Sequence, residues 1–172
     1  MSRVYTAESS IHGTGVFSSA DFSPGEIILK IDDSRVVTDA EPLDPEKGEF
    51  EHHCDYLATG KVVLMQLPER FINHRCDPNT FIRTISGDRY VVALREIRPG
   101  DEITYDYCVN GDGDIAWDCS CKSPECRKRY LSGFFHLPLD VQARYLALLE
   151  EWFVAEHGEE VKILKRRIKE GL

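Results

Sequence analysis

Two features that would place the chain in a membrane or outside the cell are missing from the sequence. It has no run of about 18 or more apolar residues, the length at which a membrane-spanning helix becomes a candidate. It also has no stretch near its start in which basic residues precede an apolar segment, so a standard secretion signal is not expected. We therefore expect a soluble, intracellular protein with no membrane partner, and the sequence does not separate a cytoplasmic from a nuclear one.

Positive charge is also scarce. The 21 Lys and Arg residues are outnumbered by 30 Asp and Glu residues, which gives a formal net charge of -9. Proteins that bind a phosphate backbone gain affinity from clustered Lys and Arg, so direct nucleic-acid binding is not expected. An acidic surface suits a basic partner instead, and the short basic run at residues 127–130 is interpreted as solvated surface.

Internal repeats and low-complexity segments are absent, and 172 residues suffice for one domain with a core and a small appendage. Up to about Val109 the pattern predicts short strands. The stretch "SPGE" (23–26) predicts a turn between two of them, "KVVLMQL" (61–67) predicts a strand, and residues 89–109 predict a strand, a Pro-Gly turn and a further strand. Residues 38–50 carry two prolines and many acids, so a surface loop is expected there.

The pattern changes to helical spacing in the last part of the chain. From Leu139 onward the apolar positions recur at helical intervals, at Val141, Tyr145, Leu148, Leu149, Trp152 and Phe153. Asp140 is available as an N-cap and Gly158 as a stop, and residues 159–172 are expected to form a second, shorter helix. This apolar stripe is expected to pack on the core of a monomer, with a homodimer contact as the alternative.

Six cysteines are present, and nothing indicates an exported, disulfide-bonded protein. Three of them, Cys119, Cys121 and Cys126, form the pattern C-x-C-x4-C. A closed structural zinc site normally has four ligands in a tetrahedron. The local motif therefore predicts a zinc site that lacks one ligand.

The missing ligand must come from elsewhere in the chain. Cys76 is favoured because it lies in a turn that the following Pro78 makes rigid. The alternative is that Cys76 is a small buried residue and that His136 or water completes the site. Cys54 and Cys108 are expected to be core residues.

Four stretches carry a family resemblance. They are "HGTGVF" (12–17), "RFINHRCDPN" (70–79), "RPGDEITYDY" (98–107) and "CSCKSPEC" (119–126). In this order and at this approximate spacing, over residues 3 to 130, the chain resembles the SET-domain protein-lysine methyltransferases that carry a zinc-binding post-SET segment.

The resemblance implies an α+β, β-rich SET fold of several small sheets with a threaded, pseudoknot-like carboxyl-terminal segment. The expected division is a SET domain over residues 3–109, a post-SET zinc segment over 110–131 and a helical tail over 132–172. It also implies S-adenosyl-L-methionine as methyl donor and a lysine in a basic protein or peptide, such as a histone tail, as acceptor. A structural Zn²⁺ would be held by Cys76, Cys119, Cys121 and Cys126.

Two tyrosines are expected at the reacting atoms. Tyr105 and Tyr107 are one residue apart on a predicted strand, so both side chains point the same way. An attacking lysine must be neutral although its usual pKa is about 10.4, and an apolar channel beside a sulfonium favours loss of the proton. The resemblance implies that Tyr107 is the catalytic tyrosine and that Tyr105 limits the product to monomethyllysine. The alternative is a non-catalytic, SET-like zinc module that binds basic protein tails.

The resemblance also implies which residues hold the cofactor. The "HGTG" backbone is expected at its amino-acid end, where glycine permits close approach. The Asn-His pair matches the positions that contact the adenosyl part, the histidine mainly through its backbone, and a tryptophan before the zinc cysteines is expected to cover the adenine face. The expected cofactor-binding residues are His12, Gly13, Thr14, Asn73, His74 and Trp117.

Overall fold

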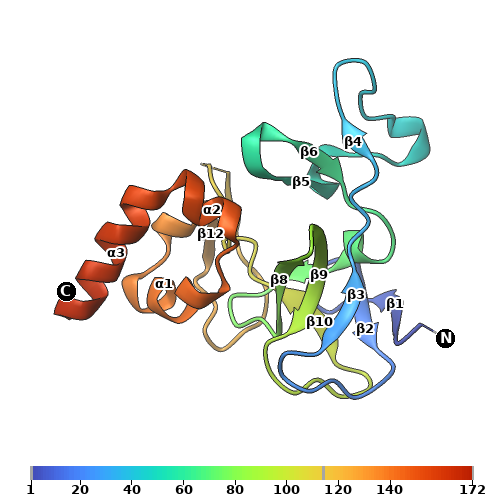
Figure 1. The fold of residues 1–172 in the computed structure, drawn as a ribbon. Coiled ribbons are helices and arrows are strands. Elements are labelled where there is room, and N and C mark those ends of the chain that lie inside the picture. The colour runs from blue at the N-terminus through green and yellow to red at the C-terminus, as the bar shows by residue number, and fades with distance from the viewer. Residues whose placement is uncertain (1, 114, 172) are drawn as a thin grey trace.

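The computed structural model describes residues 2–113 and 115–171, and it is rich in short strands, with the helices gathered at the end of the chain (Figure 1). The strands are β1 (Val4–Glu8), β2 (Thr14–Ser18), β3 (Ile27–Lys30), β4 (Val36–Val37), β5 (Cys54–Tyr56), β6 (Val62–Leu64), β7 (Asn73–His74), β8 (Thr80–Ile85), β9 (Asp88–Ala93), β10 (Glu102–Tyr105), β11 (Ala116–Asp118) and β12 (Arg129–Leu131). The helices are α1 (Leu139–Tyr145), α2 (Glu151–Glu156) and α3 (Gly158–Glu170). None of these helices is long and apolar enough to cross a membrane, for the residues described.

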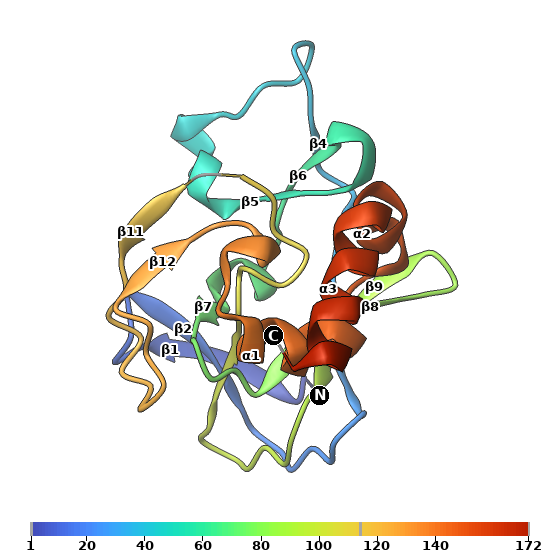
Figure 2. The same ribbon diagram turned by 90° about the vertical axis from the view of Figure 1, so that its left-hand side faces the viewer.

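The strands form four small sheets, as expected for the predicted fold class. Their orders are β1-β2-β10-β7, β3-β9-β8, β4-β6-β5 and β11-β12. The predicted strands at 61–67 and 89–109 are confirmed as β6, β9 and β10. The β4-β6-β5 sheet, called the insert sheet below, stands apart from the others in both views (Figures 1 and 2).

Strand β10 is threaded between two strands that come much earlier in the chain. It runs antiparallel to β2 and parallel to β7, with Thr104 opposite Asn73 and Tyr105 opposite His74. Parallel neighbours cannot be joined by a tight turn, so the chain between them makes a long excursion through the β8-β9 hairpin. This arrangement sets the "NH" of β7 beside the "TYDY" stretch.

The turn after β7 folds back over β10 and satisfies its backbone. The Thr104 N–H donates to Asn79 Oδ1 at 2.9 Å, and Asn79 Nδ2 donates to the Glu102 carbonyl at 2.9 Å. Thr80 Oγ1 donates to the Thr104 carbonyl at 2.8 Å. Because buried backbone groups must be paired, these polar side chains satisfy the Thr104 N–H and the Thr104 and Glu102 carbonyls in addition to the strand pairing of β10.

Two buried clusters make up the core. The first, the sheet cluster, contains Val4, Val16, Phe22, Ile28, Ile31, Met65, Ile72, Val91, Ala93, Ile97 and Ile103. The second, the cysteine-tail cluster, contains Cys76, Cys108, Cys119, Cys121, Tyr130, Phe134, Leu137, Val141, Tyr145, Leu148, Leu149, Phe153, Val161 and Leu164. The predicted packing of the tail's apolar stripe on the core is confirmed by the membership of this second cluster.

The tail helices differ from their prediction. Instead of one helix from Leu139 to Gly158, the chain breaks at Leu149 and Glu150, whose ψ angles of 136° and 148° are extended. The break follows from long-range contacts, because the Glu150 carboxylate accepts the Thr84 N–H at 3.0 Å and the Glu150 N–H donates to Asn110 Oδ1 at 2.7 Å. Helix continuation would withdraw Glu150 from both partners.

The ends of the tail helices also differ from prediction. Pro138 occupies the N-cap position of α1, and Asp140 lies in the first turn. Gly158 begins α3 instead of ending the preceding helix. With 13 residues, α3 is longer than α1 or α2, so the expectation of a shorter second helix was wrong. The predicted helix extended to Leu172, which lies outside the described residues.

Candidate functional site

The Asn73 side chain ties three segments together. Its Nδ2 lies 3.1 Å from the His12 carbonyl, 3.2 Å from the Thr14 carbonyl and 2.9 Å from Glu102 Oε1. One amide group therefore fixes the turn between β1 and β2 against β10. Among the described residues, no group donates to Asn73 Oδ1, so this acceptor is free for another molecule.

Glu102 is the second member of this arrangement, and the sequence reading missed it. Its Oε1 also accepts a hydrogen bond from Ser9 Oγ at 2.7 Å. A methyl group on Gly15 would collide with the Glu102 carboxylate, so this glycine permits the close approach of β2 and β10. Gly13 has a φ of +48°, which lets the exposed turn close with the Ser9 N–H donating to the Gly13 carbonyl at 2.8 Å.

The two predicted tyrosines lie side by side. The ring centroids of Tyr105 and Tyr107 are 4.7 Å apart. Tyr107 Oη donates to the Ile72 carbonyl at 2.6 Å, so the residue before the Asn-His pair holds the phenol. Burial raises the pKa of both tyrosines above its usual range, and both phenols are therefore neutral at physiological pH.

His74 is 7% exposed and both of its ring nitrogens have partners. The Tyr107 N–H lies 3.3 Å from Nδ1, and Cys76 Sγ lies 3.4 Å from Nε2. Burial lowers the pKa of His74 to about 4, against the opposing charge of Asp106. The ring is thus neutral, and the donation to Nδ1 assigns its proton to Nε2. His74 acts here as a bridge between Tyr107 and a cysteine.

Trp117 belongs to a group of aromatic rings that extends from Tyr107 and His74. Its ring stacks on Tyr130 with centroids 3.6 Å apart and an interplanar angle of 16°, yet 40% of the residue is exposed. Tyr130 in turn lies 6.4 Å from Tyr107 and 5.2 Å from His74, between ring centroids. The β11-β12 pairing sets Trp117 opposite Tyr130 and so creates this stack. Tyr130 lies in the "RKRY" run and was not recognised from sequence.

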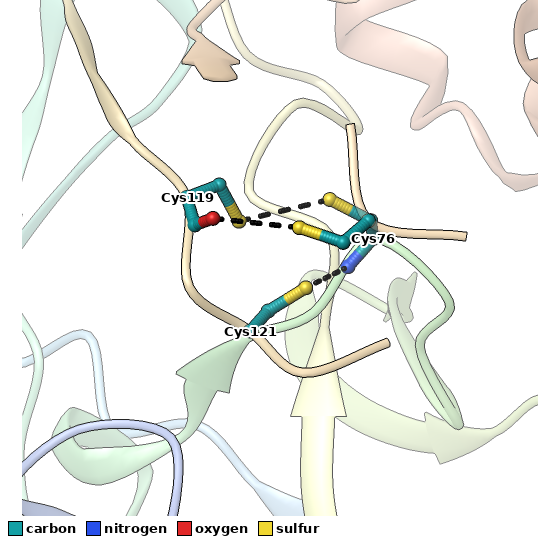
Figure 3. Close-up of side chains that lie close together, drawn as sticks. Cys76, Cys119 and Cys121 are labelled. Carbon is teal, nitrogen blue, oxygen red and sulfur yellow. Dashed lines mark hydrogen bonds between the residues drawn. The ribbon is translucent and has the colours of Figure 1, made fainter. Parts of the chain in front are cut away.

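The four cysteines of the predicted metal site meet. The sulfur atoms of Cys76, Cys119, Cys121 and Cys126 all lie within 4.8 Å of one another. Figure 3 shows Cys76 approaching Cys119 and Cys121 from a separate segment of the chain. Four thiolates at tetrahedral reach are a donor set that structural Zn²⁺ takes, so these residues could hold the ion.

Backbone N–H groups point at three of the four sulfurs. Cys121 Sγ lies 3.5 Å from the Cys76 N–H, Cys76 Sγ lies 3.5 Å from the Arg127 N–H, and Cys126 Sγ lies 3.4 Å from the Lys128 N–H. Burial raises the pKa of Cys119 to about 11. For Cys121 the N–H donors, with Cys76 the largest, overcome burial and lower the pKa to about 7. The N–H donors thus favour a thiolate at Cys121, whereas burial favours the neutral thiol at Cys119 and also raises the pKa of Cys76.

A buried ion pair joins the cysteine-rich segment to the residue that follows β10. The Asp106 side chain is fully buried, and Arg127 reaches both of its oxygens, at 2.7 and 2.9 Å. Arg127 directly follows Cys126, and Asp106 lies between the two tyrosines. This bidentate pair ties the orientation of the tyrosine strand to the cysteine segment.

The remaining histidines and cysteines lie apart from the cysteine site. His136 Nδ1 pairs with the Ser132 carbonyl at 2.7 Å, so the structure does not place it as the fourth ligand. Cys108 is fully buried, as expected, whereas Cys54 is only half-buried in β5 and is not a core residue. The His52 and His53 rings lie in the insert with centroids 4.2 Å apart and an interplanar angle of 59°, and neither belongs to the group of four cysteines.

Comparisons with known proteins agree with this geometry. The SET domain model matches residues 13–108. The human histone-lysine N-methyltransferase 2B is 33% identical over 131 residues, which are 70% of this chain and 5% of that protein. The Caenorhabditis briggsae probable histone-lysine N-methyltransferase set-23 is 42% identical over 78 residues, 42% of this chain and 30% of that protein. The chain belongs to the SET domain family.

Among the solved structures that align with this chain is that of a Plasmodium falciparum protein assigned as a histone methyltransferase. Its TM-score is 0.47 at 24% identity, covering 62% of this chain and 94% of that one. The chain spans only about a twentieth of the length of the human relative.

Proposed function

We propose that this protein transfers a methyl group from S-adenosylmethionine to the ε-amine of a lysine in a basic protein, mainly once per lysine. The observation that carries the proposal is the meeting of β7 and β10. It sets Asn73, which contacts the β1-β2 turn, beside β10, at whose end the Tyr105-Tyr107 pair lies.

The residues present fit the cofactor. Asn73 Oδ1 and the carbonyls near Gly13 would accept hydrogen bonds from an ammonium group, and the open face of Trp117 would cover a planar base. His74 is buried, so its contribution to a ligand would come through its backbone. When bound, the cofactor supplies an electrophilic methyl group on a positively charged sulfur.

The chain's own groups would then align and dehydrate the acceptor amine. The neutral acceptor amine would form the new C–N bond with the methyl group as the C–S bond breaks, with a neutral thioether as the leaving group, and the methylated ammonium would give a proton to solvent. Tyr107 is fixed by its donation to the Ile72 carbonyl, which leaves its oxygen lone pairs to receive an amine N–H. Alignment of this kind supplies roughly 7–11 kcal/mol of barrier reduction.

The restriction to one methyl group is assigned to Tyr105. Its hydroxyl occupies space next to Tyr107, and a water held there would oppose the entry of a bulkier methylated amine. A phenylalanine at this position would remove that obstacle.

The cysteine site belongs to the proposal as a structural zinc centre held by Cys76, Cys119, Cys121 and Cys126. Zinc there would join the turn after β7 to the segment that follows β11, and so hold the cofactor patch together. The division into a SET domain over 3–109, a zinc segment over 110–131 and a tail over 132–172, and an intracellular location, are part of the same proposal.

The test is calorimetric titration of zinc-replete protein with S-adenosylmethionine, followed by mass measurement of methyl transfer to basic proteins. We expect saturable binding by the wild type and by Tyr107→Phe. Asn73→Ala should weaken binding about tenfold or more, since each tenfold is about 1.4 kcal/mol and the variant loses an acceptor and frees the β1-β2 turn. Tyr107→Phe should lose transfer while keeping binding. Binding without transfer to any basic protein would favour the non-catalytic module.

A further inference from the structure

The insert sheet leads directly into the candidate site. Strand β6 continues through Met65 and the 3₁₀ turn Glu69–Phe71 to Ile72, whose carbonyl holds Tyr107. Met65 and Ile72 belong to the same sheet cluster, and Tyr105 packs against it. A shift of the β5-β6 hairpin is therefore transmitted to the residues beside the tyrosines.

The base of the insert is fixed by buried charges. Arg89, on β9 and 8% exposed, donates to both oxygens of Asp33 at 2.8 Å and to Asp55 Oδ2 at 2.5 Å. Asp33 precedes β4 and Asp55 lies on β5, so one guanidinium holds both the start of the insert and strand β5 against the β3-β9-β8 sheet. The negative charge of Asp55 also raises the pKa of Tyr105 and Tyr107, behind the larger effect of burial, which shows that it lies within electrostatic reach of them.

The tip of the β5-β6 hairpin has no comparable anchor of its own. Thr59 and Gly60 both have positive φ, 60° and 72°, as in the hairpin turn that favours Asn-Gly. A β-branched residue is disfavoured in this region, so Thr59 is strained. The tip is exposed, unlike Val63 and Leu64 nearer the base.

The contact that holds this tip comes from the tail. The Thr59 N–H donates to Glu156 Oε1 at 2.9 Å, across 97 residues of sequence. In both ribbon views the hairpin tip lies next to α2 (Figures 1 and 2). A charged acceptor strengthens a hydrogen bond and favours the one turn geometry that presents this N–H.

Helix α2 is itself anchored at its other end. Glu150, 3% exposed, precedes α2 and accepts from the Thr84 N–H at 3.0 Å, while its own N–H donates to Asn110. Phe153, in the middle of the helix, is fully buried against Phe134 and Phe135. The helix is thus a short strut between the β8 strand and the tip of the insert.

We propose that the helical tail shapes the acceptor side of the site, and that Glu156 is a positioning residue that holds the β5-β6 hairpin for substrate binding. The inference rests on the proposed function, because it concerns the lysine-bearing protein and not the cofactor. Glu156 touches neither reacting group and acts through Thr59 and the hairpin.

The test compares three variants of the full-length, zinc-replete protein. Glu156→Ala removes the acceptor, and Glu156→Gln keeps an oxygen that can accept the Thr59 N–H. Glu159→Ala is the matched control, because Glu159 is an exposed acid three residues along that pairs with Lys162 at 2.6 Å and not with the hairpin. Hydrogen exchange of the amides of residues 54–64, the KM and kcat for a basic protein, and the affinity for S-adenosylmethionine are measured for each.

We expect Glu156→Ala to speed exchange in the hairpin and to raise KM about five- to tenfold, with kcat changed less than twofold, as for lost binding that ground and transition states share. Cofactor affinity should stay at the wild-type value. Glu156→Gln and Glu159→Ala should resemble the wild type. Adding Thr59→Asn to Glu156→Ala should bring the raised KM part of the way back towards the wild-type value, because Asn tolerates the left-handed turn without the Glu156 contact.

Two results would overturn the proposal: unchanged hairpin exchange in Glu156→Ala, or faster exchange with an unchanged KM. If the wild type transfers no methyl group, the proposed function fails separately. The exchange comparison then still decides whether Glu156 holds the hairpin, and the dissociation constant of a Lys-rich peptide replaces KM.

Discussion

The two buried clusters are built by different means. The sheet cluster consists mainly of β-branched side chains from strands and the residues beside them; β1 and β2 pair in regular register, whereas β3 and β9 pair with a shift between Ile27 and Leu29. The cysteine-tail cluster gathers four sulfurs, a set of aromatic rings and three helices, joined by single polar contacts such as Tyr145 Oη to the Cys76 carbonyl at 3.3 Å. The first cluster is held together by buried apolar area and by the pairing of its strands. The second cluster depends in addition on a few single polar contacts.

The candidate site lies where these clusters meet. Asn73 belongs to the strand side, while His74 reaches Cys76 and Tyr130 belongs to the cysteine-tail cluster. Because the candidate site takes residues from both clusters, the sheet cluster and the cysteine-tail cluster must stay fixed relative to one another. The Asp106–Arg127 pair, the His74 bridge and the proposed zinc centre all serve this end.

Removing one sulfur of the cysteine group is expected to have the largest effect on the second cluster and to leave the first one intact. Cys76→Ser should lower bound zinc from one equivalent to well below one, because serine is a poor zinc ligand, and binding of structural zinc is worth about 10–16 kcal/mol in zinc-finger peptides. Hydrogen exchange should become fast in α1–α3, while the β3-β9 amides stay protected. S-adenosylmethionine binding should fall with it.

Cys54→Ser is the matched control for that change, since Cys54 lies on β5 outside the cysteine group. It should keep both zinc and tail protection. Full zinc content and a protected tail in Cys76→Ser would show that the second cluster does not depend on this sulfur.

The next largest effect is expected from the ion pair that links the halves. Asp106→Asn leaves the Arg127 charge without its carboxylate in a buried site, which typically costs about 3–5 kcal/mol. Urea unfolding should show this loss. Glu125→Gln, which breaks the exposed pair with Arg144 at 2.9 Å, should cost under about 1 kcal/mol. Equal losses in the two variants would argue against the special role of the buried pair.

The same contrast explains what the sequence could predict. Strands β6, β9 and β10 follow from alternation and from turns with Gly and Pro, which are local signals. The cysteine group follows from the spacing of three thiols and from the resemblance that supplied Cys76. The break in the tail could not be predicted, because Thr84 and Asn110, 66 and 40 residues away from Glu150, decide it.

The missed members of the site share that cause. Glu102 lies within the stretch 98–107, but nothing in it singles this residue out, and Tyr130 and Arg127 lie in a basic run whose composition predicts solvated surface. Each belongs to the site through a contact with a residue elsewhere in the sequence: Glu102 with Asn73, Tyr130 with Trp117 and Arg127 with Asp106. The signal that could have found Arg127 is its place directly after Cys126, the last cysteine of the C-x-C-x4-C pattern.

A substitution at Tyr105 changes the candidate site, where the two clusters meet, with a smaller effect on the structure. Tyr105→Phe keeps the ring that packs on the sheet cluster and removes only the hydroxyl, so stability should change by less than about 1.5 kcal/mol. Intact-mass analysis of the acceptor should show di- and trimethyllysine appearing where the wild type makes mainly monomethyllysine. An unchanged product distribution would remove Tyr105 from the control of methylation degree.

The smallest expected effect concerns pH on the strand side of the molecule. Burial, followed by the charges of His52 and Arg70, lowers the pKa of His53 from 6.5 to about 4. An unfolded chain therefore takes up a proton on this ring before the folded one does. The stabilisation from the neutral ring is complete above pH 6.5 and is lost as the pH falls towards 4.

A full shift of this size would correspond to about 3 kcal/mol, and partial solvent exposure of His53 reduces the expected loss to about 1–2 kcal/mol. His53→Gln, which cannot titrate, should flatten the stability curve between pH 6.5 and 4 by that amount, as measured by urea unfolding at several pH values. His12→Gln, at an exposed histidine, should leave the slope unchanged. Parallel slopes in wild type and His53→Gln would mean that His53 is solvated in solution and that its burial does not stabilise the insert.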